Sequence, residues 1–174
     1  MNILYLSAIP FKIEKNPSIY TDLIQELTIF GDKVTVASID SSLKPFQIKR
    51  TVEKNIDLIY IGSFQLYNVN ILKKGLAIIT LPFFMKRAIK KLDISKFDLI
   101  LYETPITWAG IVNQIKKKNK IKSFLMLKDI FPQNAVDIGL MKKDSLIFNY
   151  FKRKEELLYE VSDYIGCMSK GNIE

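Results

Sequence analysis

Residues 2–37 read NILYLSAIPFKIEKNPSIYTDLIQELTIFGDKVTVA, and this stretch decides the fold class. It begins with an apolar run at residues 3–6 and ends with a second one at residues 34–37. Between the two runs, Ser18 is typical of a helix N-cap, apolar residues recur after it at helical spacing, and Gly31 is typical of the residue that follows a helix. The pattern predicts a strand–helix–strand unit at the start of the chain.

The same alternation continues along the chain. Further apolar runs predict strands at residues 58–61, 98–102, 123–127 and 164–168. Helical patterns lie between them at residues 71–92, at residues 108–115 and after an Asp144 cap, and the last of these is expected to bury one face made of Ile147, Tyr150, Phe151, Leu158 and Val161. Six strands alternating with helices predict an α/β fold in one domain over residues 1–174: a Rossmann-like, doubly wound, mostly parallel sheet with helices on both faces.

Composition excludes several kinds of chemistry. The 174 residues contain no histidine and one cysteine, which excludes histidine general bases, histidine metal sites and cysteine-rich zinc sites. We expect no bound metal. The loop after the first strand has no glycine, so a GxGxxG dinucleotide site is not predicted, and there is no Walker A motif. Any chemistry must rest on carboxylates, hydroxyls, lysines or the backbone.

The charge balance points to anionic partners of a general kind. The formal net charge is +8, from 26 lysines and arginines against 18 acidic residues, and three of the cations are arginines. Because arginine is the preferred reader of bases, specific nucleic-acid binding is not predicted, and a diffuse positive field suits an anionic membrane as well. No segment has the roughly 20 apolar residues of a spanning helix, and the N-terminus lacks a basic signal-peptide region. We expect a cytoplasmic protein.

A basic amphipathic segment covers residues 84–92. Its cations fall on one side of a helical wheel and its apolar residues on the other. We call these cations the basic cluster: Lys86, Arg87, Lys90 and Lys91. The segment either lies in the interface of an anionic membrane or belongs to an ordinary helix that covers the sheet with a solvated basic face.

Acidic side chains follow two neighbouring strands of the predicted sheet. Glu103 and Asp129 come after the strands at residues 98–102 and 123–127. Ligands of open α/β sheets lie beyond the carboxyl ends of the strands, so the two carboxylates could converge there, and one could act as general base for an acceptor hydroxyl. The other interpretation is that each acid caps the next helix or pairs with a lysine. Further candidates at strand ends are Ser7, Lys128, Pro132 and Ser169.

Three segments carry a resemblance to a known family. They read MNILYLS at residues 1–7, LKDIFPQNAVD at residues 127–137 and YEVSDYIGCMS at residues 159–169. Together they resemble the N-terminal domain of family 4 glycosyltransferases, most closely the bacterial branch that adds N-acetylfucosamine and related sugars in O-antigen and capsule assembly. The resemblance covers essentially the whole chain.

The resemblance implies the GT-B architecture, in which two Rossmann-like domains face each other across a cleft. Residues 1–174 would be the N-terminal, acceptor-binding domain, and the acceptor would be a lipid-linked saccharide at the cytoplasmic face of the membrane. A nucleotide-sugar donor, UDP-linked, would bind a C-terminal domain that is absent here, or a separate subunit. We therefore expect no cofactor on this domain, no turnover by it alone, and a peripheral location at the inner face of the cell membrane.

The resemblance also implies residue roles. It assigns the polarising or positioning of the acceptor to Asp129, with Glu103 as second choice, and its motif adds Asn134 to the cleft. Many relatives have a glycine-rich loop after the first strand and a histidine after the strand that here ends in Leu127; this chain has neither, although the close branch carries an acid there too. The basic cluster would contact acidic lipid or the diphosphate of the acceptor. The alternatives are a non-catalytic, membrane-recruiting subunit of a split glycosyltransferase and a basic nucleic-acid-binding α/β module.

Overall fold

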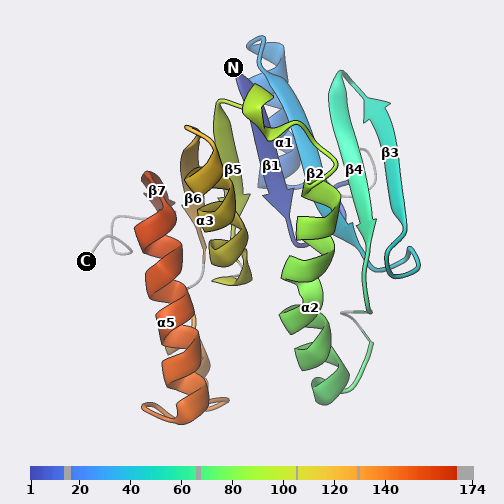
Figure 1. Ribbon diagram of the computed structural model, residues 1–174. Helices are drawn as coiled ribbons and strands as arrows, with labels where there is room; N and C mark the ends of the chain where they lie inside the picture. Colours follow the sequence, from blue (N-terminus) through green and yellow to red (C-terminus); the bar gives the residue numbers. More distant parts are fainter. Residues whose placement is uncertain (14–16, 66–67, 105, 129, 168–174) are drawn as a thin grey trace.

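Within the residues that the computed structural model describes (1–13, 17–65, 68–104, 106–128 and 130–167), seven strands form one sheet (Figure 1). The strands are β1 (Asn2–Ser7), β2 (Lys33–Asp40), β3 (Ile48–Glu53), β4 (Ile56–Gly62), β5 (Leu99–Glu103), β6 (Lys122–Leu127) and β7 (Tyr164–Cys167). Their order in space is β3-β4-β2-β1-β5-β6-β7. All neighbours are parallel except β3, which runs antiparallel to β4.

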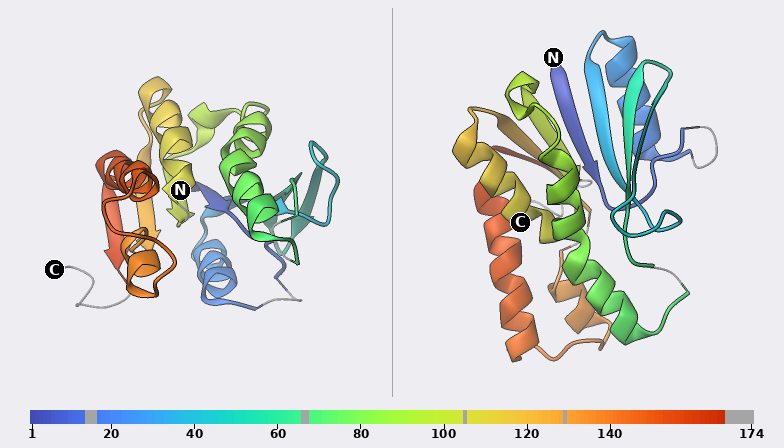
Figure 2. Two further views of the ribbon diagram at one scale, coloured as in Figure 1. Left: turned by 90° about the horizontal axis from the view of Figure 1, so that it is seen from below. Right: turned by 45° about the vertical axis from the view of Figure 1, so that its right-hand side comes forward.

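Helices cover both faces of the sheet (Figure 2). The α-helices are α1 (Ile19–Ile29), α2 (Ile71–Ile89), α3 (Ala109–Lys118), α4 (Gln133–Asp137) and α5 (Leu146–Val161), and the short 3-10 helices are η1 (Ile94–Lys96) and η2 (Ile106–Trp108). One face packs against α1, and the other packs against α2, α3 and α5. The Rossmann-like, doubly wound α/β fold expected from the sequence is confirmed.

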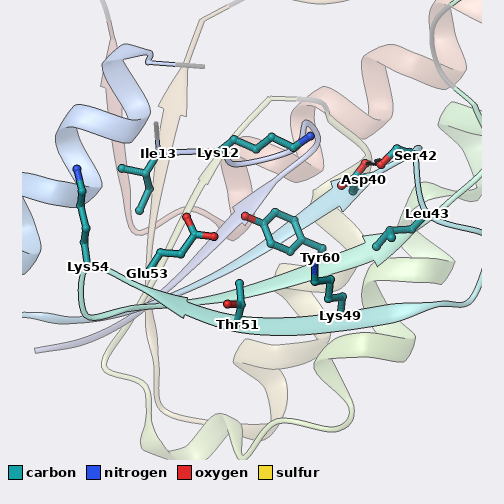
Figure 3. Close-up of a pocket in the computed structure, with 10 residues that line it drawn as sticks. All are labelled: Lys12, Ile13, Asp40, Ser42, Leu43, Lys49, Thr51, Glu53, Lys54 and Tyr60. Carbon is teal, nitrogen blue, oxygen red and sulfur yellow. Dashed lines mark hydrogen bonds between the residues drawn. The ribbon is translucent and has the colours of Figure 1, made fainter. Parts of the chain in front are cut away.

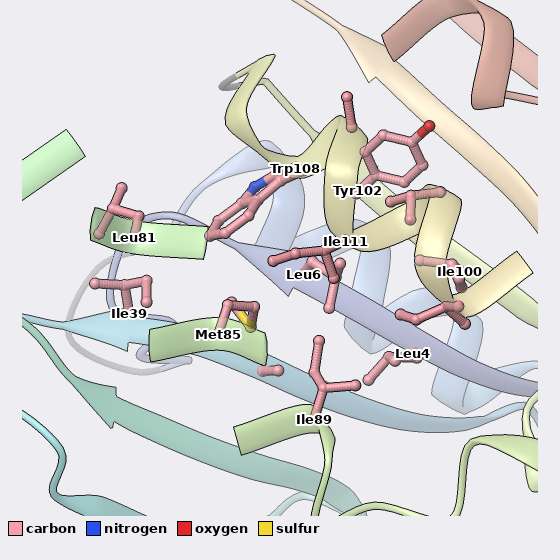
Figure 4. Close-up of a cluster of buried hydrophobic side chains, with 14 of the residues drawn as sticks. Leu4, Leu6, Ile39, Leu81, Met85, Ile89, Ile100, Tyr102, Trp108 and Ile111 are labelled. Atoms are coloured by element: carbon pink, nitrogen blue, oxygen red, sulfur yellow. The ribbon is translucent and has the colours of Figure 1, made fainter. Parts of the chain in front are cut away.

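The central strand β1 is buried on both faces. Its even-numbered side chains, Leu4 and Leu6, pack with Leu81 and Met85 of α2 (Figure 4). Its odd-numbered side chains pack toward α1, where Tyr5 stacks on Tyr20. Burying a leucine or isoleucine fully stabilises the fold by about 2 kcal/mol, so a strand that is apolar on both sides anchors both layers of helices.

The first helix has the ends that its sequence indicates. Ser18 caps α1, since its hydroxyl accepts from the Thr21 amide over 3.2 Å and the Thr21 hydroxyl accepts in turn from the Ser18 amide. Gly31 follows the helix with φ of +93°, a conformation that suits glycine. The predicted strand–helix–strand unit is confirmed.

The edge strand β3 is a correction to the six predicted strands. Most of its side chains are exposed, so it lacks the apolar run that marks a buried strand. It is held by antiparallel pairing with β4 and by Arg50, which donates to both carboxylate oxygens of Asp57 over 2.7 Å. Lys54 and Asn55 join β3 to β4 with φ of +49° and +64°, as a two-residue hairpin turn of type I′ requires.

The last long helix also differs from expectation. Ser145, not Asp144, caps α5, because its hydroxyl accepts from the Phe148 amide. Of the residues expected on its buried face, Leu158 and Val161 are buried, which confirms them, and Phe151 is half-buried, whereas Ile147 and Tyr150 are exposed. Phe148 and Glu155 are buried as well, and an apolar pattern misses Glu155 because it is a glutamate, whose oxygens accept from Lys152 and Tyr159.

Asp163 ties the amino end of β7 to β6 and α3. Its carboxylate accepts from the Ser123 amide over 2.8 Å and from Lys116 Nζ over 2.7 Å, and Lys116 also donates to the Val161 carbonyl. Burial disfavours the charge of Asp163, but the hydrogen bonds from Lys116 and Ser123 outweigh it, so its pKa lies well below the usual range. Lys116, in the last turn of α3, is therefore a structural residue.

We predict that Asp163→Asn lowers the free energy of unfolding by about 2 kcal/mol at pH 7, because it removes charge-assisted hydrogen bonds. A carboxylate with a depressed pKa stabilises the fold above its unfolded pKa of about 3.9 and loses that effect as pH falls through the folded value. The difference between the wild-type chain and the variant should therefore shrink below about pH 4. Urea unfolding at pH 7, 5 and 3 measures it, and a constant difference would contradict the assignment.

Candidate functional site

Polar side chains meet at the carboxyl ends of β1 and β5. Because these strands are parallel neighbours, Ser7 and Glu103 end side by side. Both side chains are buried, with exposed fractions of 1% and 2%. The Ser7 hydroxyl donates to Glu103 Oε1 over 3.2 Å. The convergence predicted from the sequence was that of Glu103 with Asp129, which lies outside the described residues; the contact of Glu103 with Ser7 joins two of the strand-end candidates.

Lys128, which follows β6, completes the cluster. Its Nζ lies 2.7 Å from Glu103 Oε2 and 4.2 Å from the centre of the Tyr20 ring. Burial opposes the charged form of Lys128, but its interactions with Glu103 and Tyr20 outweigh that effect, so its pKa is raised. The ammonium group is therefore held in its charged form between the end of β5 and the start of α1.

A cavity of about 410 Å³ opens beside this cluster. It lies between the loop after β1 and the first turn of α1, and its lining includes Tyr5, Ser7, Phe11, Tyr20 and Glu103. The pKa of Tyr5 is raised far above its ordinary value, first by burial and then by the charge of Glu103, so its hydroxyl stays neutral. Neutral hydroxyls, aromatic rings and a charged pair together suit a polar ligand that carries hydroxyl groups.

The geometry assigns Glu103 a defined structural role. One carboxylate oxygen contacts Ser7 and the other contacts Lys128, which confirms the interpretation that this acid pairs with a lysine. Its part in a reaction stays a prediction. Sequence reasoning did not include Tyr5 and Tyr20, because aromatic residues at strand and helix spacing are indistinguishable from ordinary core residues until the loop after β1 is in place.

The remaining residues of the predicted cleft are spread out. Pro132 is buried and Asn134 is exposed, and both lie in the segment after β6 that forms α4. Neither lines the cavity beside Glu103. Asp129 and Ser169 lie outside the described residues. Among the residues that are described, no group of three or more acidic, cysteine or histidine side chains could hold a metal ion.

The basic cluster lies far from this cavity. Its four side chains are exposed, whereas Met85, Ala88 and Ile89 are buried, so the predicted two-sided pattern is confirmed. Since α2 runs antiparallel to β1, its last turn lies at the amino end of the sheet, opposite Glu103 (Figure 1). No helix in the described part of the chain is long and apolar enough to cross a membrane.

No protein-family profile matches the chain, and no curated protein sequence does. Solved structures match its fold. They include an E. coli trehalose-6-phosphate synthase bound with UDP-2-fluoro glucose (11% identity, TM-score 0.65) and an alpha,alpha-trehalose-phosphate synthase (UDP-forming) from Burkholderia vietnamiensis (10% identity, TM-score 0.64). Another is Arabidopsis thaliana UGT89C1 complexed with UDP (14% identity, TM-score 0.52).

These matches cover 98%, 98% and 95% of this chain but 41%, 40% and 44% of the matched chains. The chain therefore spans about two fifths of the length of the structures it resembles. The matched proteins are GT-B glycosyltransferases, and this chain shares the Rossmann-like α/β fold of the part of them that it matches. At these identities the likeness is one of fold alone.

We predict that Lys128→Met destabilises the chain by about 3 kcal/mol at pH 7, because it leaves Glu103 charged and buried without a cation. The double variant Glu103→Gln/Lys128→Met should be more stable than Lys128→Met alone, because it removes the buried charge together with its partner. Thermal unfolding of the three chains at pH 7 measures this, and equal stability of Lys128→Met and wild type would show that the ion pair does not hold the site together.

Proposed function

We propose that this chain is the acceptor-binding half of a glycosyltransferase that moves a sugar from a nucleotide-sugar to a lipid-linked saccharide, in the synthesis of a surface polysaccharide such as capsule or O-antigen. The observation that carries the proposal is the cavity beside Glu103 and Lys128, at the carboxyl edge of a GT-B-like sheet. That edge is where open α/β sheets bind ligands. The family resemblance of the segment at residues 127–137 supports a lipid-linked saccharide as the acceptor.

In this proposal the nucleotide-sugar donor binds outside residues 1–174. The matched structures are more than twice as long as this chain, and two of them hold UDP or a UDP-sugar analogue. We infer a UDP-linked donor, bound by a second domain of a longer chain or by a separate subunit. This chain then binds the acceptor and supplies one wall of the reaction cleft, and turnover needs both halves.

The candidate residues take different roles in this scheme. Sugar transfer joins an acceptor hydroxyl to the anomeric carbon of the donor, the nucleoside diphosphate leaves, and the hydroxyl proton must go to a base. Asp129 is the acid that the family resemblance assigns to that step or to positioning the acceptor. Glu103 is a positioning residue, because Ser7 and Lys128 already engage its oxygens. Lys128 then directs a fixed positive charge toward an anionic group such as the acceptor diphosphate.

In the enzyme that contains both halves, we predict that Asp129→Asn lowers kcat by at least about 100-fold, the usual contribution of a general base. The melting temperature should change by no more than a few degrees. Sugar transfer from a UDP-sugar to a lipid-linked acceptor measures the rate. Undiminished turnover would remove Asp129 from the mechanism, whereas a stable, inactive wild-type pair of halves would favour the non-catalytic recruiting subunit.

A membrane-facing surface fits this acceptor. The exposed side of α2 carries apolar side chains along the middle of the helix, where Leu76, Ile79 and Phe83 have exposed fractions of 59%, 62% and 56%. It is basic in its last turn, and the basic cluster begins about 20 Å from the start of the helix at the usual rise per residue. An apolar stripe followed by cations is typical of a segment that lies in the interface of an anionic bilayer. We infer that the basic cluster contacts acidic lipid rather than a diphosphate in the cavity.

More exposed apolar side chains lie around the start of α5. They belong to the connection after α4 and to the first turn of the helix: Ile138, Leu140, Leu146 and Ile147. The first turns of α2 and α5 both lie at the carboxyl edge of the sheet (Figure 1). A bilayer reached from this edge would bring a lipid-linked acceptor close to the cavity beside Glu103.

We predict that the chain sediments with vesicles that contain phosphatidylglycerol and does not sediment with pure phosphatidylcholine vesicles. Changing all four residues of the basic cluster to glutamate should weaken binding at least tenfold, because each cation near an anionic surface contributes about 1 kcal/mol. The matched control reverses four exposed lysines elsewhere: Lys33, Lys54, Lys117 and Lys118.

The control should lose less binding than the cluster variant, although both chains change their net charge equally. Equal losses would mean that the net charge of the chain, not the basic cluster, drives association. No binding to either vesicle would end the membrane proposal for this chain and would leave the acceptor proposal to the transfer assay.

A further inference from the structure

A larger cavity, of about 650 Å³, lies away from the Glu103 cluster. It is lined by the loop after β1, the segment that follows β2, the edge strand β3 and its neighbour β4 (Figure 3). Tyr60 of β4 stands at the centre of its lining, with Glu53 and Lys54 toward one end and Asp40, Ser42 and Leu43 toward the other (Figure 3).

The edge strand gives this cavity a polar wall beside an apolar floor. Alternate residues of β3 share one face, so Lys49, Thr51 and Glu53 all line the cavity. The register pairs Lys49 with Tyr60 and Thr51 with Leu58, both of which belong to the apolar cluster on the α1 side. Ligand sites combine these two kinds of surface, with an apolar floor and a few polar groups that orient the ligand.

The loop after β1 separates this cavity from the one beside Glu103. Phe11 lines the Glu103 cavity and Ile13 lines the larger one, and both are buried. The Tyr60 hydroxyl donates to the Phe11 carbonyl oxygen over 2.8 Å and so holds this wall against β4. A ligand in the larger cavity is therefore separate from one that reacts beside Glu103.

Four charged side chains in the larger cavity form no ion pair within the described residues. Asp40 is 7% exposed, and one of its carboxylate oxygens accepts from the amide and the hydroxyl of Ser42 over 2.9 and 2.6 Å. No ion pair among the described residues includes Asp40, Glu53, Lys12 or Lys49. The carboxylates accept hydrogen bonds only and the ammonium groups donate only. A buried carboxylate that no cation neutralises needs donors from a ligand or from water.

We infer that this cavity is a second binding site, for an anionic saccharide. Sugar hydroxyls donate to Asp40 and Glu53, the Tyr60 ring supports the apolar face of the sugar, and a phosphate or carboxylate on the sugar contacts Lys12 and Lys49. A simple anion does not fit as well, because the two carboxylates repel it. A neutral sugar leaves the two lysines without a counter-charge. This inference concerns binding alone and does not rest on the proposed function.

The test is a titration of the 15N-labelled chain with four probes. Binding is monitored through the NMR signals of the backbone amides. Glucose 6-phosphate and glucuronate carry hydroxyls together with an anionic group, whereas glucose carries hydroxyls alone and inorganic phosphate carries charge alone. We expect the first two to shift the signals of residues 49–53 and to bind at least tenfold tighter than the last two. Whichever of glucose 6-phosphate and glucuronate binds more tightly shows whether the site prefers a phosphate or a carboxylate as the anionic group.

Two variants locate the site. Lys49→Gln removes one exposed cation and should weaken glucose 6-phosphate binding about tenfold, as expected for a charge-assisted contact. Asp40→Asn should also weaken glucose 6-phosphate binding, because it removes the carboxylate charge while it preserves the shape of the side chain. The control is Lys33→Gln, which makes the same charge change as Lys49→Gln. Lys33 lies at the amino end of β2, at the opposite end of that strand from Asp40, so its loss should leave binding unchanged.

Three results would overturn the inference. The first is a set of shifts confined to residues near Ser7 and Glu103, which would place the sugar in the other cavity and would leave the proposed function standing. The second is binding of inorganic phosphate as tight as that of glucose 6-phosphate. The third is an unchanged dissociation constant in both Lys49→Gln and Asp40→Asn.

Discussion

The pairing of β1 with β2 on one side and β5 on the other is the constraint on which the rest of the structure depends. Both edges of β1 are hydrogen-bonded to parallel neighbours, and both of its faces are covered by helices. Such a strand has no place for a polar side chain along its length. Polar groups therefore gather where β1 and β5 end, and Ser7 and Glu103 meet there because the two strands share a direction and a register.

Charged groups lie at both edges of the sheet, and two of the ion pairs described above differ in what surrounds them. At the amino edge, Asp163 is held by Lys116 and by the backbone and hydroxyl of Ser123, so its hydrogen bonds go to structural partners. At the carboxyl edge, Glu103 and Lys128 form a pair beside a cavity. A charged pair that borders open space can meet a ligand, whereas one enclosed by backbone can only fasten strands together.

The loop after β1 borders both cavities. It forms one wall of the cavity beside Glu103 and one wall of the larger cavity over β3 and β4, and the hydrogen bond from Tyr60 to Phe11 holds it in place. In the proposed enzyme the first cavity receives the reacting end of the acceptor. The exposed side of α2 faces away from the sheet, and its apolar and basic side chains are accessible for contact with a membrane.

The sequence by itself determined the α/β class and six of the seven strands in the described part of the chain, because apolar runs are local signals. It also predicted that the cations of the basic cluster and the neighbouring apolar residues fall on opposite sides of a helix. It did not predict β3, whose exposed side chains carry no apolar pattern, or the burial of Phe148 and Glu155 in α5. Only the tertiary structure decided that Glu103 pairs with Lys128 and that Asp40, Lys49 and Tyr60 share a cavity. These contacts join residues that are distant in the chain, and no local pattern records them.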